Sequence, residues 1–213
     1  MRGQLILIEG LDRSGKSTQS VKLHESIKDS FIVKFPDRST RIGSIINEYL
    51  TNEDFKLPDQ SIHLLFSANR WEVIQDMIDK LNNGHTIILD RYIYSGISYS
   101  LSKSQLSNTK NEMSDVDWLY SPDKGLPKPD LTLFLSLELD QINSRAEFGE
   151  ERYEKTEFQK IVKSNFLKIL PQEGVKILNV NDKSIEEVQK MIWEIIEQGD
   201  YNKLTNNPIS YFT

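Results

Sequence analysis

Positions 10–17 carry the residues with the clearest chemistry, because they read Gly-Leu-Asp-Arg-Ser-Gly-Lys-Ser. Glycines at this spacing let backbone NH groups close around phosphate oxygens, as in a Walker A loop. Lys16 adds a positive charge for the phosphates, and Ser17 adds a hydroxyl group for Mg²⁺. The pattern predicts a nucleoside triphosphate as the first ligand of the chain.

A second cluster, Asp90-Arg91, follows the apolar run 86–89, which we expect to be a buried strand. Ligands of open parallel sheets bind at the carboxyl ends of the strands. There Asp90 can hold the Mg²⁺ shell, and the planar fork of Arg91 can bind a phosphate. A structural salt bridge at the end of a strand would give the same dipeptide. Because the chain also contains a Walker loop, the functional interpretation is favoured.

Two further groups suit an acceptor molecule. Arg38 follows the apolar run 31–35 and reaches the ligand side of the sheet if that strand neighbours the first, where it can bind a second phosphate group. Phe66, Asn69 and Arg70 are spaced to share one face of a helix, and an aromatic plane beside a donor fork suits a nucleobase. Phe66 fits an ordinary core position equally well, so the helix alone does not decide.

The elements that must position these residues follow from the apolar pattern. Five apolar runs of strand length alternate with helical segments, which predicts a parallel sheet covered by helices. These runs are 5–8, 31–35, 86–89, 131–135 and 175–180. The first run enters the Walker loop, and segment 16–27 after the loop has the spacing of a helix. We therefore expect one α/β domain that spans residues 1–213.

Segment 61–82 shows the clearest helical periodicity. A second apolar stripe on it, at Leu64, Ala68, Trp71 and Ile78, predicts packing against another helix or another subunit. We expect a homodimer, with extra core packing as the alternative.

Segment 102–130 is polar and contains several helix breakers, so we expect a long loop with a short helix around Trp118. Its first part, 102–117, is expected to be mobile at the surface. The tail 201–213 shows no regular pattern.

Composition sets the remaining limits. The chain has 213 residues, no cysteine and a net charge of −6, which excludes disulfides and disfavours a general nucleic-acid surface. No apolar run approaches the roughly 18 residues that a membrane span needs. We expect a protein of the cytoplasm, with the nucleus as a second location, and neither a membrane nor a nucleic-acid partner.

Several of these motifs, taken together, resemble the thymidylate kinase family, and within it the eukaryotic, especially the yeast, branch. The resemblance runs from about residue 4 to about residue 193. It rests on Asp12-Arg13 in the loop, Phe-Pro-Asp-Arg-Ser-Thr at 35–40, Asn-Arg-Trp-Glu at 69–72, Asp-Arg-Tyr at 90–92, Ser95-Gly96, Tyr99, Leu-Pro-Lys-Pro-Asp-Leu at 126–131 and Glu-Arg-Tyr-Glu at 151–154.

The resemblance implies transfer of the γ-phosphoryl group of ATP to thymidine 5′-monophosphate (dTMP), giving the diphosphate for dTTP synthesis, with Mg²⁺ as cofactor. The fold it implies is the P-loop nucleoside monophosphate kinase fold: a five-stranded parallel sheet flanked by helices, with a lid segment at about 145–155, in a protein that usually dimerises.

The same resemblance assigns residue roles. For the ATP side these are phosphate binding by Gly10, Arg13, Ser14, Gly15, Lys16, Ser17 and Thr18, Mg²⁺ binding by Ser17 and Asp90, and adenine contact by Arg145. For dTMP they are the 3′-hydroxyl (Asp12), the phosphate (Arg38, Arg91), the base (Phe66, Arg70, Ser95, Gly96), the space at the sugar 2′ carbon (Tyr99) and lid closure (Tyr153). The catalytic residues would be Arg13, Lys16 and Arg91.

Arg13 resembles the arrangement in which the loop itself supplies the catalytic arginine, whereas bacterial relatives have glycine there and use lid arginines. We therefore expect Arg13 to be the main catalytic arginine, and Arg152, in the lid, to be the candidate that follows it.

Three alternative functions are consistent with a Walker loop. A small GTPase needs Asp-x-x-Gly and Asn-Lys-x-Asp downstream, and neither occurs after residue 17. Another nucleotide or nucleoside kinase would share the phosphate-binding residues. The choice of acceptor base therefore depends on four side chains, Phe66, Arg70, Ser95 and Tyr99. A nucleotide-gated regulatory module binds phosphates without transferring them, so it does not need arginines for an acceptor phosphate. Arg13, Arg38 and Arg91 therefore argue against such a module.

Overall fold

The computed structural model describes residues 1–213 except 108–109, 140, 142–151 and 154. Five parallel strands form one sheet in the order β2-β3-β1-β4-β5. Their bounds are β1 Leu5–Gly10, β2 Ser30–Lys34, β3 Thr86–Asp90, β4 Leu131–Ser136 and β5 Val175–Asn179. All five predicted strands and the predicted fold class are confirmed.

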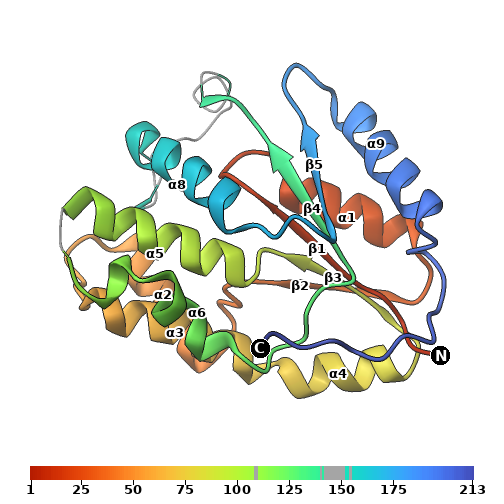
Figure 1. Cartoon of the computed structure of the whole chain (residues 1–213), viewed down its shortest axis with the longest axis horizontal. Helices are drawn as coiled ribbons and strands as arrows, with labels where there is room; N and C mark the ends of the chain where they lie inside the picture. The colour runs from red at the N-terminus through yellow and green to blue at the C-terminus, as the bar shows by residue number, and fades with distance from the viewer. Residues whose placement is uncertain (108–109, 140, 142–151, 154) are drawn as a thin grey trace.

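Helices cover both faces of the sheet (Figure 1). Helices α1 and α9 pack together on one face, and α4, α5 and α8 cover the other, as right-handed crossovers require. The α-helices are α1 Lys16–Ser26, α2 Arg41–Thr51, α3 Asp59–Glu72, α4 Ile74–Asn82, α5 Ile93–Ser107, α6 Val116–Tyr120, α8 Thr156–Ile169 and α9 Ile185–Gln198, and the 3-10 turns are η1 Glu112–Ser114 and η2 Ser121–Asp123.

The central strands of the sheet are apolar on both sides because helices cover both faces. Every residue of β1 and β3 is buried, and the largest apolar cluster of the described residues forms around these strands. Because β1, β2 and β3 are parallel, their carboxyl ends lie at the same edge of the sheet. That edge carries the Walker loop, Arg38 and Asp90-Arg91.

Two predictions about the helices need correction. The single helix expected at 61–82 is interrupted at Val73, which lies between α3 and α4. The loop expected at 102–130 begins later, because 102–107 is still part of α5. Ser102 is buried there, where its hydroxyl donates to Ser98 O (2.6 Å) and accepts from Asn165 Nδ2 (2.8 Å). Internal hydrogen bonds thus let a polar sequence pack as a helix.

The short helix around Trp118 is confirmed as α6. Met113 is buried in a small cluster with Ile97 and Leu119, which argues against a freely mobile surface segment at that point. The predicted lid, 145–155, lies mostly outside the described residues, and so does Arg145. None of the helices in the described part of the chain is long and apolar enough to cross a membrane.

Candidate active site

The Walker loop connects β1 to α1 through a tight backbone path. Gly15 has φ 93°, a conformation that glycine adopts without strain, and a Cβ added at Gly10 would lie 2.6 Å from Ser14 Oγ. Lys16 is buried, and its Nζ donates to Leu11 O at 2.6 Å. Burial, followed by the nearby Arg91 charge, lowers the pKa of Lys16 to about 8. A phosphate in the loop would favour the charged ammonium again.

Ser17 and Asp90, the residues expected to bind Mg²⁺, are hydrogen-bonded to each other. Ser17 Oγ donates to Asp90 Oδ2 at 2.5 Å, and Lys34 Nζ lies 3.9 Å from the same carboxylate oxygen. The other oxygen, Asp90 Oδ1, is buried and has no hydrogen-bond partner in the described part of the chain. A hydroxyl group beside a buried carboxylate with a spare oxygen is a donor set that suits a hard cation such as Mg²⁺.

Arg91 is fixed in the site by several oxygens. Its guanidinium pairs with Asp12 Oδ1 and donates to Ser95 Oγ (3.0 Å) and Gly10 O (3.3 Å). Burial alone disfavours its charge, but the neighbouring groups Tyr99, Asp12 and Glu9 outweigh burial and raise the pKa of Arg91. Arg91 is thus a permanent cation at the carboxyl end of β3.

Asp12 is the centre of a second group of hydrogen bonds. Its Oδ2 accepts from Tyr99 OH and from Gln159 Nε2, each at 2.8 Å. Burial raises the pKa of Asp12, but the charges of Arg91 and Lys16, together with these hydrogen bonds, lower it overall. An ionised Asp12 can accept a hydrogen bond from a ligand hydroxyl group.

Glu9, the buried acid at the end of β1, holds the start of α5. Its carboxylate accepts from the backbone NH groups of Tyr92 (2.9 Å) and Ser95 (3.1 Å) and from Ser95 Oγ (2.6 Å). Burial raises the pKa of Glu9 despite the Arg91 charge and these hydrogen bonds. Glu9 thereby connects β1, the strand before the Walker loop, to α5, the helix that carries Ser95 and Gly96.

The expected base-binding residues lie between α3 and α5. Arg70 is buried and makes a bidentate pair with Asp123, with Nε to Oδ1 at 3.0 Å and Nη2 to Oδ2 at 2.6 Å. A Cβ added at Gly96 would lie 3.1 Å from Arg70 Nη1, so glycine leaves room for the guanidinium. Phe66 packs against a cluster that includes Ile62, so it has a core role in addition to lining the cavity.

Asn69, on the same face of α3 as Phe66 and Arg70, binds the segment that follows β2. Its Oδ1 accepts from Asp37 N (2.8 Å), and its Nδ2 donates to Asp37 O (3.1 Å) and Thr40 Oγ1 (3.0 Å). Asn69 therefore holds the segment that carries Arg38, whose Nη1 donates to Asn47 Oδ1 at 2.9 Å.

One cavity joins these groups. Thirteen of the predicted site residues line it: Asp12, Arg13, Lys16, Ser17, Arg38, Phe66, Arg70, Asp90, Arg91, Ser95, Gly96, Tyr99 and Tyr153. Gly10, Ser14, Gly15 and Thr18 belong to the loop and the start of α1 but do not line this cavity. The cavity runs from the Walker loop and the strand ends to the space between α3 and α5.

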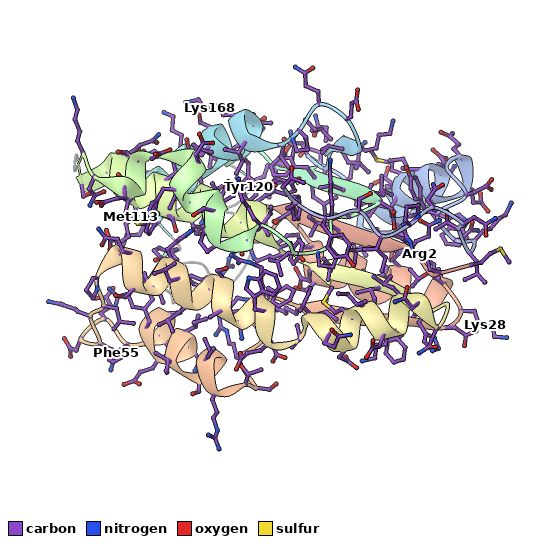
Figure 2. The ribbon with its side chains drawn as sticks, turned by 60° about the horizontal axis from the view of Figure 1, so that its bottom comes forward. Arg2, Lys28, Phe55, Met113, Tyr120 and Lys168 are labelled. Carbon is purple, nitrogen blue, oxygen red and sulfur yellow. The ribbon has the colours of Figure 1, made fainter. Side chains whose placement is uncertain are left out.

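The described part of the lid contacts the arm formed by α2 and α3. Arg152 donates to the carbonyl oxygens of Tyr49 (2.9 Å), Asn52 (2.9 Å) and Phe55 (3.0 Å) at the end of α2. Figure 2 marks Phe55 in the connection between these two helices. Here the guanidinium of Arg152 is engaged with a helix end, and the neighbouring Tyr153 stacks on Phe158 at 5.2 Å between ring centroids.

Sequence reasoning missed three residues that support the site: Glu9, Asp123 and Gln159. Glu9 had a usable signal, since it is a charged residue inside an apolar run directly before Gly10. Gln159 and Asp123 had none, because their partners are far away in the sequence, as with Arg70 and Asp123.

Comparison with known proteins gives consistent matches. The family model for thymidylate kinase matches residues 8–192. Thymidylate kinase of Dictyostelium discoideum is 44% identical over 208 residues (95% of this chain, 88% of that protein), and that of Homo sapiens is 39% identical over 213 residues (98% and 96%). A solved structure of thymidylate kinase from Candida albicans is 55% identical, with a TM-score of 0.95 over 100% of this chain and 99% of that one.

Proposed function

We propose roles for the residues of this site from one premise, that the chain belongs to the thymidylate kinase family. It is an ATP-dependent phosphotransferase that converts dTMP to thymidine 5′-diphosphate, a step of nucleotide biosynthesis. One observation supports these roles. The same cavity is lined by Lys16, the proposed phosphate-binding residue, and by Phe66 and Arg70, the proposed base-binding residues. Donor and acceptor can therefore meet inside it.

The Walker loop binds the phosphates of ATP. Backbone NH groups of the loop and the start of α1 point to the same anion, and Lys16 neutralises charge on the transferred group. The lowered pKa of Lys16 fits this role, because a buried ammonium gains most from an anion. Ser17 and Asp90 would hold Mg²⁺, which would supply positive charge to neutralise the phosphates.

The acceptor is held at three points. Arg91 and Arg38 bind the phosphate of dTMP, and the ionised Asp12 accepts a hydrogen bond from the 3′-hydroxyl group. Tyr99 fills the space beside the 2′ carbon, where its OH is tied to Asp12. Arg70 donates to the base opposite Gly96. This grip aligns the acceptor oxygen with the γ-phosphate, and alignment is the main contribution to phosphoryl transfer.

Arg13 is the group assigned to the transition state. It lies in the Walker loop, lines the same cavity, and its φ of 64° is unusual for a residue with a side chain. A long cation at this position neutralises the charge that develops between donor and acceptor. Tyr153 and the lid close over the cavity and exclude water, which favours transfer over hydrolysis. Arg145 would contact adenine from the lid.

The assembly and setting of the enzyme complete the proposal. Leu64 and Trp71 are exposed on α3, with 45% and 39% of their surfaces accessible, and an apolar face of this kind suits a homodimer. Residues 1–213 act as one domain. The location proposed is the cytoplasm, with the nucleus as a second compartment.

Substitution of Lys16 tests the phosphate site. Lys16→Ala is expected to abolish transfer with little loss of stability, because the side chain serves a ligand-binding loop. Lys22→Ala is the matched control, since Lys22 lies on the same helix and its ammonium is 3.8 Å from Glu186 at the surface. A folded Lys16→Ala enzyme with near-normal turnover would contradict the assignment.

A coupled ATP-consumption assay across nucleoside monophosphates tests the base site. The kcat/KM for dTMP should exceed that for other acceptors. A higher value for a purine acceptor would remove Phe66 and Arg70 from the base-binding roles while leaving the phosphate-binding residues in place.

A further inference from the structure

The C-terminal tail packs against the loop that supports Arg70. Residues 201–213 form neither helix nor strand, but two isolated bridges hold them, Thr205 with Arg2 and Tyr211 with Pro127. Figure 1 shows the C-terminus beside α6, and Figure 2 marks Arg2 and Tyr120 along this region. The tail therefore follows a defined path despite its irregular sequence.

Backbone hydrogen bonds join the end of the tail to segment 123–128. Phe212 donates to Leu126 O (3.0 Å) and accepts from Gly125 N (2.8 Å), and Lys128 N donates to Ser210 O (2.7 Å). These reciprocal bonds resemble one rung of an antiparallel ladder. They fix the position of the segment that follows η2.

The side chain of Phe212 anchors this contact. Only 5% of it is exposed, and its ring meets Tyr120 at 5.8 Å, Tyr92 at 6.1 Å and Tyr94 at 6.1 Å between centroids. Two of these contacts are close to edge-on, with interplanar angles of 86° and 89°. Phe212 thus sits where the loop after α6 meets the residues that follow Arg91.

The anchored loop carries Asp123, which is fully buried and binds Arg70 through both carboxylate oxygens. Ser67 Oγ also donates to Asp123 Oδ1 at 2.7 Å. This arrangement engages Nε and Nη2 of Arg70 and leaves Nη1 beside Gly96. The direction of Nη1 is therefore set by Asp123, whose own position depends on the loop.

We propose that the backbone of residues 210–212, together with the Phe212 ring, is a positioning clamp, which holds Asp123 and through it aims the Arg70 guanidinium at the base of dTMP. The inference rests on the proposed role of Arg70. A guanidinium only donates hydrogen bonds, so its aim selects bases that present a carbonyl oxygen at that edge over bases that present an amino group. Loss of the clamp lets Arg70 move and weakens that selection.

Phe212→Ala is the test, with Tyr211→Ala as the matched control, because the neighbouring Tyr211 side chain is 43% exposed. We expect the KM for dTMP to rise by about 10-fold or more, the scale of a lost hydrogen bond to a charged group. The KM for ATP and the kcat should change less than about twofold, since the Walker loop is untouched. Phe212→Leu should restore most of the affinity.

Base selection separates positioning from a general loss of structure. The kcat/KM ratio of dTMP to 5-methyl-2′-deoxycytidine monophosphate, which has an amino group in place of the O4 carbonyl, should fall for Phe212→Ala and stay constant for Tyr211→Ala. A chain that ends at Ser210 serves as a second variant if Phe212→Ala unfolds, with thermal unfolding as the check on both.

Two results would overturn the clamp. One is an unchanged KM for dTMP in a folded Phe212→Ala enzyme, and the other is a parallel rise of the KM values for ATP and dTMP. Failure of the proposed function is a separate outcome, because the wild-type chain would then fail to prefer dTMP.

Discussion

Arg13→Gly removes a side chain without disturbing the loop that carries it. The φ of Arg13 is 64°, a left-handed conformation that costs an L-residue roughly 1 kcal/mol and costs glycine almost nothing. Glycine is therefore a better substitution than alanine, which would keep the unfavourable backbone. We expect the melting temperature of Arg13→Gly to equal or slightly exceed that of the wild type.

The expected loss of activity follows from the charges around Arg13. A lost transition-state donor costs about 10²–10³-fold, and a lost arginine finger about 10³–10⁵-fold. Lys16 and Arg91 line the same cavity and remain in the variant, so they keep part of the stabilisation. We therefore expect kcat to fall by about 10²–10⁴-fold, which corresponds to about 3–5 kcal/mol.

The assay is steady-state turnover at saturating dTMP, with ATP varied to separate kcat from KM. The KM for ATP should change far less than kcat, because the cradle for ground-state phosphates is backbone. Arg13→Lys is the matched variant, and partial recovery is expected from a charge without the planar fork.

An unchanged kcat with a raised KM for ATP would refute the reasoning, because Arg13 would then only anchor the ground state. Arg152 would become the next candidate. In the present structure its guanidinium binds the carbonyl oxygens of Tyr49, Asn52 and Phe55, so catalysis by Arg152 would require the lid to leave α2.

Three further predictions concern specificity, stability and assembly. Tyr99→Ala should raise activity on the ribose form, 5-methyluridine monophosphate, relative to dTMP, and an unchanged ratio would remove Tyr99 from the specificity residues. Burial lowers the pKa of His63 from 6.5 to about 4, so the stability that neutral His63 contributes is complete above pH 6.5 and is lost as the pH falls toward 4. Urea unfolding measures this loss: between pH 6.5 and 4, the free energy of unfolding should fall by about 3 kcal/mol more for the wild type than for His63→Phe. Sedimentation at micromolar protein should show a dimer that Leu64→Glu or Trp71→Glu dissociates, and a monomeric wild type would reject the interface.

Local patterns were sufficient for the strands and the Walker loop. Each predicted strand is a short apolar run, and burial on both faces of a parallel sheet requires that pattern. The break at Val73 was not predictable in this way, because apolar residues continue at helical spacing on both sides of it. The helical serines after residue 101 were also misjudged, since their acceptors and donors lie inside the fold. Ser102, for example, binds Asn165, 63 residues away.

The site residues show the same difference between local and long-range sequence signals. The residues proposed to contact the substrates lie in short motifs, so Lys16 and Arg91 could be identified from their neighbours in the sequence. Residues that orient them are paired over long separations, such as Arg70 with Asp123 across 53 positions. A single sequence carries no direct signal for such pairs, because any of many acids satisfies the charge.

The two central cations of the site behave differently because of their neighbours. Burial lowers the pKa of Lys16, and the fixed positive charge of Arg91 lowers it further. Arg91, in contrast, is held by Asp12 and lies close to Glu9, so its charge is stable before any substrate arrives. Arg91 can therefore act as a preorganised anchor for the acceptor phosphate, whereas the charge on Lys16 is weakened by burial and would be strengthened by the phosphates of ATP. The carboxylates of Asp12 and Glu9 favour both positive charges, but at Lys16 burial and the Arg91 charge outweigh them.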